Sequence, residues 1–384
     1  MKQANKILIM PKQNLIKHTL IILLLLLSNC GKKYNINRDE ITKKAVLIYL
    51  SANNNLKKEA ISAIMKLQKG LTGFEGTILV YVKTENQLSY LIKIKHSLED
   101  RLVSDTLITY QSGNSSNPNF LKKVINDSRK VAPAYSYGLI LWSHATSWLP
   151  AIKNISTKSF GIDNGIEMNI SDLKDALPND FEFILFDACY MGSIEVLYEL
   201  RNKTKYFLSS PTEVLASGFP YEECTKFFFN GLEGLKEVAN RYINYYKSKD
   251  GAYSSATISL LDATKLEKIA IATKNILKKR KYSLRNLDNI QRLNFQVGTD
   301  IISSFDFLDF FTKNFSDDDL KELSIALQDA IIFKANTNTF LNQKIISFSG
   351  LGIYIPSTAN DSYITIYKYL EWEKDSNWIS NFLN

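Results

Sequence analysis

Residues 181–192 read FEFILFDACYMG, and this stretch decides the expected fold. Its first six residues are almost all apolar, as in a strand that helices bury on both faces of a parallel sheet. Residues 136–144 read SYGLILWSH and repeat the pattern, with an apolar run that ends in polar side chains. The two runs therefore predict buried strands whose carboxyl ends carry His144 and Cys189.

Outside these two runs, short β-branched and aromatic segments alternate with longer helical patterns. The alternation predicts an α/β fold, a three-layer sandwich with a mostly parallel central sheet flanked by helices. The sequence has no Pro/Gly/Ser-rich linker and no internal repeat, which favours one domain over residues 43–384. The expected strands are 44–50, 76–82, 106–110, 136–143, 181–186, 206–209, 258–261 and 350–356, and the expected helices are an amphipathic stretch ending at Leu67 and residues 119–130, 193–201, 231–247, 264–281 and 318–336.

The first thirty residues are typical of a lipoprotein signal peptide. Four lysines precede the apolar run 20–27, which is too short to cross a bilayer core that needs about 20 helical residues. The run ends at Ser28-Asn29-Cys30, which resembles a bacterial lipobox in which the cysteine is lipidated. We expect an exported protein of the bacterial cell envelope, anchored by lipid on Cys30 and followed by the polar spacer 31–42. The alternative is an ordinary signal peptide with an incidental cysteine.

Composition excludes several other classes of protein. The formal net charge is +8, but half of it comes from the lysines that precede Cys30, and the remaining charges of both signs are interspersed. The sequence therefore indicates no nucleic-acid partner. The chain has three cysteines and three histidines, which are too few for a convincing zinc site of Cys and His ligands. A disulfide between Cys189 and Cys224 is allowed by count alone, and His96 lies in a charged segment that we expect at the surface.

The residues with the strongest functional signal are His144 and Cys189, because each follows an expected strand directly. Reactive groups of open α/β sheets gather beyond the carboxyl ends of strands. We expect a helix to begin at Cys189, and its positive N-terminal end would lower the pKa of the thiol. A nearby imidazole could hold the thiol proton and pass it to a leaving amine. The competing interpretations are a buried structural thiol and a hydrogen-bonded core histidine.

The segments around these residues resemble the clostripain family of cysteine peptidases, in the caspase–gingipain–legumain clan. The segment around Cys189 is similar to the family's catalytic-cysteine segment, and residues 141–144 are similar to its catalytic-histidine strand. The two residues are 45 positions apart, close to caspase-type spacing of about 50. Further similar segments are 47–54, 160–164, 210–221, 305–310 and 350–356.

The resemblance implies a caspase-like sandwich and a cysteine endopeptidase that acts on peptide or protein substrates. It makes Cys189 the nucleophile and His144 the general acid and base. The backbone N–H groups of Ala145 and Cys189 would form the oxyanion hole. Asp187 would lie at the floor of the S1 pocket, where a carboxylate attracts a Lys or Arg at P1.

Two positions depart from the family's pattern. Ala145 stands where the family usually has Gly, and its Cβ makes a positive φ costly. Ser217 stands where relatives with a strict basic preference tend to carry a second acid.

The resemblance also implies a zymogen, cut by the enzyme itself in the loop beyond the catalytic histidine, after Lys158 or else after Lys153. The alternative is that this loop is a plain surface connection.

Two rival functions and one open question remain at this point. A non-catalytic envelope lipoprotein could keep the peptidase fold and bind peptide or protein. A carbohydrate-active enzyme would need two carboxylates, for which Asp306 and Asp309 are candidates, although a helix entry and a surface acid explain them more simply. We expect no cofactor in the chemistry. A calcium requirement stays open, with candidate oxygen ligands at Asp163, Glu167, Asp172 and Asp175.

Overall fold

A computed structural model describes residues 41–149, 159–279, 287–295, 304–356 and 361–381. All of these belong to the compact unit Asp39–Asn384. The lipobox Cys30 and the spacer 31–42, apart from its last two residues, lie outside the described residues, as do Lys153 and Lys158. Among the helices that the structure describes, none combines the length and apolar character needed to cross a bilayer.

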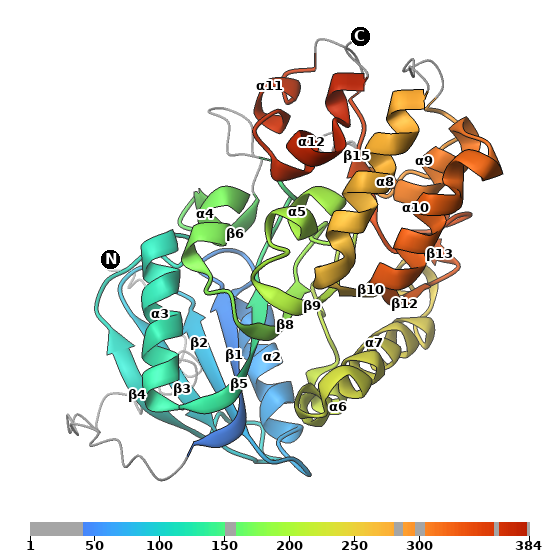
Figure 1. Ribbon diagram of the computed structural model, residues 1–384. Coiled ribbons are helices and arrows are strands. Elements are labelled where there is room, and N and C mark those ends of the chain that lie inside the picture. Colours follow the sequence, from blue (N-terminus) through green and yellow to red (C-terminus); the bar gives the residue numbers. More distant parts are fainter. Residues whose placement is uncertain (1–40, 150–158, 280–286, 296–303, 357–360, 382–384) are drawn as a thin grey trace, which may run out of the picture. The chain divides into compact units, whose positions relative to one another are not determined.

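The centre of the described chain is a nine-stranded mixed sheet in the order β12-β10-β9-β8-β5-β1-β2-β3-β4 (Figure 1). The five strands in its middle run parallel, and the strands at both edges pair antiparallel. The expected α/β sandwich with a mostly parallel core is therefore confirmed. The parallel strands are β9 (Thr204–Ser209), β8 (Phe181–Asp187), β5 (Ala134–Trp142), β1 (Thr42–Ser51) and β2 (Thr77–Lys83), and the edge strands are β3 (Ser89–Ile94), β4 (Ser104–Tyr110), β10 (Thr257–Asp262) and β12 (Ile331–Asn336).

Helices cover both faces of this sheet (Figure 1). Side chains alternate between the faces along β1: Leu47 belongs to one core cluster and Ile48 to the other. Both are buried, which explains why the strand is apolar throughout. The first cluster lies under α3 (Pro118–Val131), α4 (Ile170–Ala176), α5 (Ile194–Glu199) and α8 (Leu266–Lys279), and the second under α2 (Lys57–Lys69), α6 (Tyr221–Cys224) and α7 (Gly231–Lys247).

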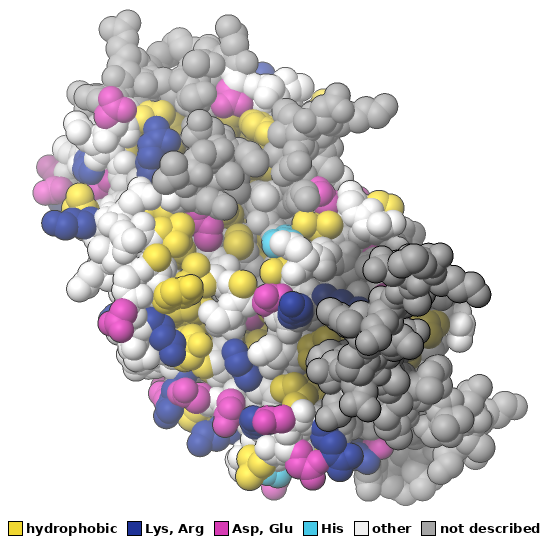
Figure 2. All heavy atoms as spheres, turned by 180° about the vertical axis from the view of Figure 1, so that it is seen from behind, with side chains coloured by type: hydrophobic (Ala, Val, Ile, Leu, Met, Phe, Trp, Pro, Cys, Tyr) yellow, Lys and Arg dark blue, Asp and Glu magenta, His cyan; other side chains and the backbone are white. Residues whose placement is uncertain are grey.

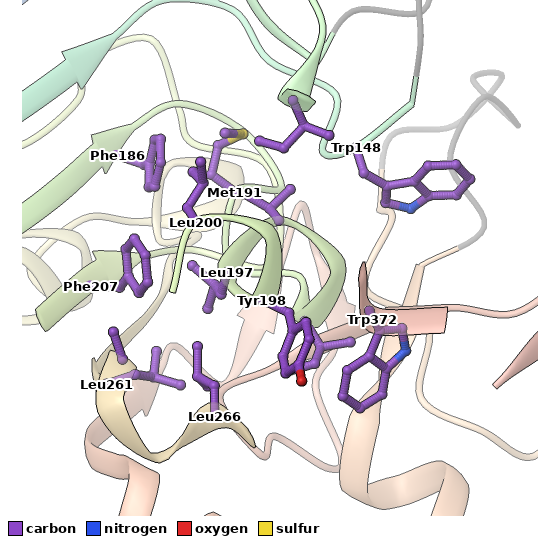
Figure 3. Packing of buried hydrophobic residues seen from close by; sticks show 14 of the residues in the cluster. Trp148, Phe186, Met191, Leu197, Tyr198, Leu200, Phe207, Leu261, Leu266 and Trp372 are labelled. Carbon is purple, nitrogen blue, oxygen red and sulfur yellow. The ribbon is translucent and has the colours of Figure 1, made fainter. Parts of the chain in front are cut away.

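The first cluster fixes the segment that follows β8 (Figure 3). Phe186 of β8 and Phe207 of β9 stack with their ring centroids 6.3 Å apart. Met191, Leu197 and the other apolar side chains of this segment are buried beside them. The strand end that carries Cys189 is thus anchored by packing on both sides of the cysteine.

The rest of the described chain packs around this sandwich. Two expectations are corrected here. Strand β3 is not among the expected strands. The helix expected over 318–336 is shorter than predicted, because α10 (Asp317–Ala330) ends at Ala330 and edge strand β12 begins with Ile331-Ile332-Phe333. The strand expected over 350–356 is β15 (Gly352–Tyr354), which pairs with β11 (Ser304–Asp306) outside the main sheet. The remaining elements are β6 (Phe160–Asp163), β7 (Ile166–Met168), α9 (Phe307–Asn314), β13 (Thr339–Phe340), β14 (Gln343–Lys344), α11 (Ile364–Tyr367), α12 (Glu371–Ser376) and the short 3₁₀ turns Thr225–Phe229, Gly251–Tyr253, Ala263–Lys265 and Ile379–Asn381.

Candidate active site

His144 and Cys189 follow neighbouring parallel strands at the same edge of the sheet. In the pairing of β5 with β8, Trp142 is the register partner of Asp187. His144 lies two residues beyond Trp142, and Cys189 lies two residues beyond Asp187. The structure therefore brings the two predicted residues to adjacent strand ends, where side chains of parallel sheets converge.

The His144 ring is half-buried, and one of its nitrogens has a defined partner. Nε2 of His144 lies 2.7 Å from Oδ1 of Asn55, in the loop that follows β1. The backbone carbonyl of His144 accepts a hydrogen bond of 2.9 Å from the N–H of Gly161. Both the ring and the backbone of His144 are thus held by segments distant in sequence.

The Cys189 thiol is partly exposed and lies against the backbone of Val214. The Val214 N–H donates to Sγ at 3.3 Å, and Sγ also lies 3.7 Å from the Val214 carbonyl oxygen. The pKa of the thiol is raised to about 12, mainly because the thiol is buried; the Val214 N–H opposes this increase, and the carboxylates of Glu213 and Asp187 add to it. The isolated thiol therefore carries its proton at neutral pH.

The expectation of a helix that begins at Cys189 is wrong. Helix α5 begins at Ile194, with Ser193 as the N-cap. The cysteine therefore lies several residues before the positive N-terminal end of the helix. The intervening Tyr190 adopts a left-handed φ of 62°. Its N–H donates to Thr212 at 2.8 Å, which pins the loop against the segment after β9. The sharp turn at Tyr190 delays the helix, and the thiol pKa is raised instead of lowered.

The backbone around Ala145 leaves a donor available beside the site. Ala145 does not adopt a positive φ, so the substitution of the family's Gly costs no backbone strain here. It forms an isolated antiparallel bridge with Phe160, whose hydrogen bonds are donated by Gly161 and Thr146. Within the described part of the chain, neither the Ala145 N–H nor the Cys189 N–H donates to another residue.

Asp187 is buried under the loop that precedes α6. Its Oδ2 accepts hydrogen bonds from the Tyr221 hydroxyl at 2.8 Å and from the Phe219 N–H at 3.2 Å. A Cβ on Gly218, which has a φ of 60°, would lie 2.7 Å from the same oxygen, so the glycine lets the loop close over the carboxylate. No described residue donates to Oδ1. Burial raises the pKa of Asp187 to about 6, although its two donors lower it.

Ser217 faces a lysine instead of presenting an acid. The Lys66 ammonium on α2 lies 3.5 Å from the Ser217 carbonyl oxygen, and the Ser217 hydroxyl lies 3.1 Å from the Tyr246 hydroxyl. The positive charge of Lys66 reaches Asp187, where it is a minor influence that lowers the pKa. The neighbourhood of the buried carboxylate thus contains a cation of the chain itself.

The other residues singled out in the sequence have structural partners. Cys189 and Cys224 are both free thiols, and Cys224 is fully buried. Asp306 caps α9, and Asp309 is buried and paired with Lys313 at 2.8 Å, so Asp309 is not the surface acid that we expected. His96 is exposed.

Asp163, one of the candidate calcium ligands, is already engaged. It is buried and forms an ion pair of 2.9 Å with the buried Lys83. Its carboxylate also accepts from Asn53 and Ser115. In the regions that the structure describes, no group of three or more His, Cys, Asp or Glu side chains could hold a metal ion.

The visible face in Figure 2 carries Lys and Arg side chains interspersed with Asp and Glu, around hydrophobic side chains that gather near its middle. No stripe of one charge sign crosses the described part of that face.

Sequence reasoning missed Asn55, Val214 and Tyr221. Asn55 had a usable signal, because it follows a strand of the same parallel sheet as His144. Val214 contributes only backbone atoms to Sγ, and any residue except proline could donate that hydrogen bond. Tyr221 lies on a different segment from Asp187, and no sequence pattern joins the two.

Comparison with known proteins gives one family. The model of the clostripain family matches residues 48–382. A secreted cysteine protease from Bacteroides thetaiotaomicron, solved with an irreversible peptide inhibitor, shares 27% sequence identity over 88% of this chain and 99% of that chain, with a TM-score of 0.76. An inactive zymogen protease from Parabacteroides distasonis shares 29% over the same proportions, also with a TM-score of 0.76.

A clostripain from Bacteroides thetaiotaomicron, in complex with the peptide inhibitor BTN-VLTK-AOMK, shares 27% identity over 56% of this chain and 97% of that chain, with a TM-score of 0.50. Comparison with the curated proteins finds no match.

Proposed function

The chain belongs to the clostripain family of cysteine peptidases, and from that premise we propose that it is an endopeptidase that uses Cys189 and His144 as a catalytic dyad. The observation that carries the proposal is the register of β5 with β8, which sets both residues two positions beyond a paired strand end. A thiol and an imidazole at adjacent strand ends are the two groups that acyl transfer from a peptide needs.

The proposed reaction starts from a protonated thiol, because burial raises the pKa of Cys189 to about 12. The imidazole of His144 takes the thiol proton as Sγ bonds to the substrate carbonyl carbon. The tetrahedral intermediate collapses, the C–N bond breaks, and the imidazolium gives its proton to the leaving amine. Water then attacks the thioester with His144 again as base, which releases the acid and restores the thiol. No cofactor is needed for these steps.

The oxyanion would be held by the N–H groups of Ala145 and Cys189. Both lie beside the site, and neither donates to another described residue. Donors that are already fixed in place cost no reorganisation when the negative charge develops.

A basic residue at P1 is the substrate preference that we propose. The support comes from Asp187, whose Oδ2 is held by the chain while Oδ1 has no donor among the described residues. With a pKa of about 6, the carboxylate is mostly ionised at neutral pH and can pair with a Lys or Arg side chain. The peptide part of the inhibitor bound to the clostripain from Bacteroides thetaiotaomicron also ends in lysine.

We further propose export, lipid anchoring and activation by cleavage. The relative from Bacteroides thetaiotaomicron is a secreted protease, and the relative from Parabacteroides distasonis is an inactive zymogen. In this chain the lipobox Cys30 would tether the enzyme to the bacterial envelope, and that lipid would be its contact with the membrane. Cleavage after Lys158 would activate it.

A peptidyl-lysyl acyloxymethyl ketone tests the dyad on the full chain. The expected result is one covalent adduct, located on Cys189 by peptide mass spectrometry and lost in Cys189→Ala. Cys224→Ala is the matched control, because that thiol is fully buried and should neither react nor matter for turnover. His144→Ala should lower kcat by several orders of magnitude, because dyad residues act as a unit. An adduct on Cys224 would refute the assignment, and no adduct together with no turnover would favour the non-catalytic peptide-binding protein.

A further inference from the structure

Asn55 connects the loop after β1 to the ring of His144. Its Oδ1 lies 2.7 Å from Nε2 of His144, at hydrogen-bonding distance. The Asn55 side chain is exposed, and this is its one hydrogen bond to the residues that the structure describes. It therefore contributes little to the core, and its one defined partner is the proposed acid–base residue.

The neighbours of Asn55 have other tasks that hold the loop in place. Asn53 donates to Asp163 at 2.5 Å, and Asn54 donates to the Ile162 carbonyl at 2.9 Å. The Asn54 side chain also accepts from the Leu56 N–H at 2.9 Å. The run of three asparagines thus divides into two anchors and one side chain directed at His144.

A capping role does not account for Asn55. Helix α2 begins at Lys57 with Leu56 at the N-cap, and no side chain caps it. The hydrogen bond to His144 is therefore not a by-product of helix initiation.

We propose that Asn55 is a positioning residue for His144, a third member of the catalytic arrangement that fixes the tautomer of the imidazole. The proposal rests on the proposed function, in which His144 exchanges protons with Cys189. With the amide oxygen as acceptor, Nε2 carries the hydrogen and Nδ1 is the nitrogen that takes the thiol proton. When the imidazolium forms, the Nε2–H···Oδ1 bond becomes charge-assisted and stronger, so Asn55 stabilises the state that forms during the reaction.

Kinetics on the full chain provide the first test. Asn55→Ala should lower kcat about 10- to 100-fold with little change in KM. The reason is that the hydrogen bond becomes charge-assisted when the imidazolium forms, so its removal destabilises the reacting state more than the bound substrate. The acid limb of the pH profile of kcat/KM should move to lower pH in Asn55→Ala and to higher pH in Asn55→Asp, whose carboxylate favours the imidazolium. Asn86→Ala is the matched control, because Asn86 is also an exposed asparagine near this loop and its partner is Asn53. An unchanged kcat in Asn55→Ala, or a loss confined to KM, overturns the proposal.

A second test does not depend on activity. Nitrogen-15 NMR of Cys189→Ala protein can report the tautomer of His144, assigned with His144→Gln, since the chain has three histidines. The proposal requires the Nε2–H tautomer. It also requires the pKa of the His144 imidazole to be lower in the Asn55→Ala variant than in the protein that keeps Asn55. The Nδ1–H tautomer, or a pKa that Asn55→Ala leaves unmoved, contradicts it. An inactive wild-type protein with the expected NMR behaviour would instead refute the proposed peptidase dyad while keeping the hydrogen bond.

Discussion

The hydroxyl of Tyr221 donates a hydrogen bond of 2.8 Å to Oδ2 of Asp187, two residues before the proposed nucleophile Cys189. Together with the Phe219 N–H, it stabilises the ionised carboxylate against the cost of burial. Both donors bind the same oxygen, and no described residue donates to the other oxygen, which would pair with a basic side chain of the substrate in the proposed S1 pocket. The loop that carries Tyr221 therefore sets the charge state of the proposed S1 pocket.

Selectivity for basic P1 residues should depend on pH near 6. Asp187 is mostly ionised above its pKa of about 6 and mostly protonated below it. The ratio of kcat/KM for a Lys substrate to that for a Leu substrate should therefore fall about tenfold from pH 7 to pH 5. The ratio is the quantity to measure, because titration of the dyad affects both substrates alike. Asp187→Asn should lower the ratio at pH 7 and remove its pH dependence.

Two Tyr→Phe variants test the origin of this pH dependence, one at a donor to Asp187 and one as its control. Tyr221→Phe removes a donor to the carboxylate, so the midpoint of the selectivity curve should move to higher pH. Tyr242→Phe removes a buried hydroxyl that has no hydrogen-bond partner in the described chain, so it should leave the midpoint in place. Equal losses for Lys and Leu substrates in Asp187→Asn would show that the carboxylate supports the fold instead of the pocket.

Regular structure could be predicted from the sequence more completely than the site. Buried parallel strands are apolar throughout, so polar residues at their ends stand out in the sequence. This pattern allowed His144 and Cys189 to be identified. Local patterns do not show where a helix ends and an edge strand begins, so the sequence predicts one helix over 318–336, which includes the strand Ile331–Asn336. The left-handed turn at Tyr190 could not be predicted either, because the position holds neither glycine nor asparagine, the residues that usually indicate a positive φ.

The partners of the site residues were beyond sequence reasoning for a different reason. Asn55 meets His144 across 89 positions, and Tyr221 meets Asp187 across 34. Such contacts follow from strand order, which the sequence alone leaves open. Strand ends could be identified one by one, but not which of them face each other.

Lys66 should weaken the preference for basic P1 residues. Its ammonium lies 3.5 Å from the Ser217 carbonyl oxygen and acts electrostatically on Asp187. Lys66→Gln should raise the ratio of kcat/KM for Lys over Leu substrates, by about 2- to 5-fold at low salt, because the lysine is partly exposed and screened. Lys69→Gln is the matched control on the same helix, since Lys69 pairs with Asp100 at 2.9 Å. The idea fails if both variants leave the ratio unchanged.

The lipid anchor should depend on one sulfur atom. Cys30→Ser should release the protein from the membrane fraction with its peptidase activity intact. Acyl chains on Cys30 would contribute about 0.8 kcal/mol of membrane-binding free energy for each buried CH₂, and the variant would lose this contribution. Metabolic labelling with a palmitate analogue checks this, and Cys189→Ser, which should keep the label, is the control. Label that survives in Cys30→Ser would exclude the lipobox.

Self-cleavage after Lys158, or else after Lys153, should yield two fragments that remain associated. Both lysines lie outside the described residues, but the flanks of their loop are tied together. The Ser159 hydroxyl donates to the Leu149 carbonyl at 2.8 Å, and β5 and β8, which lie on opposite sides of the loop in sequence, are paired in the sheet. A cut between the flanks removes none of these contacts. Wild type and Cys189→Ala should therefore be incubated side by side, with fragment masses measured after denaturation and elution compared under native conditions. We expect fragments only in wild type, co-elution of the pair, and loss of the cut in Lys158→Ala if that site is used. A single intact chain with full activity would end the zymogen proposal, and fragments that persist in Cys189→Ala would identify another protease as their source.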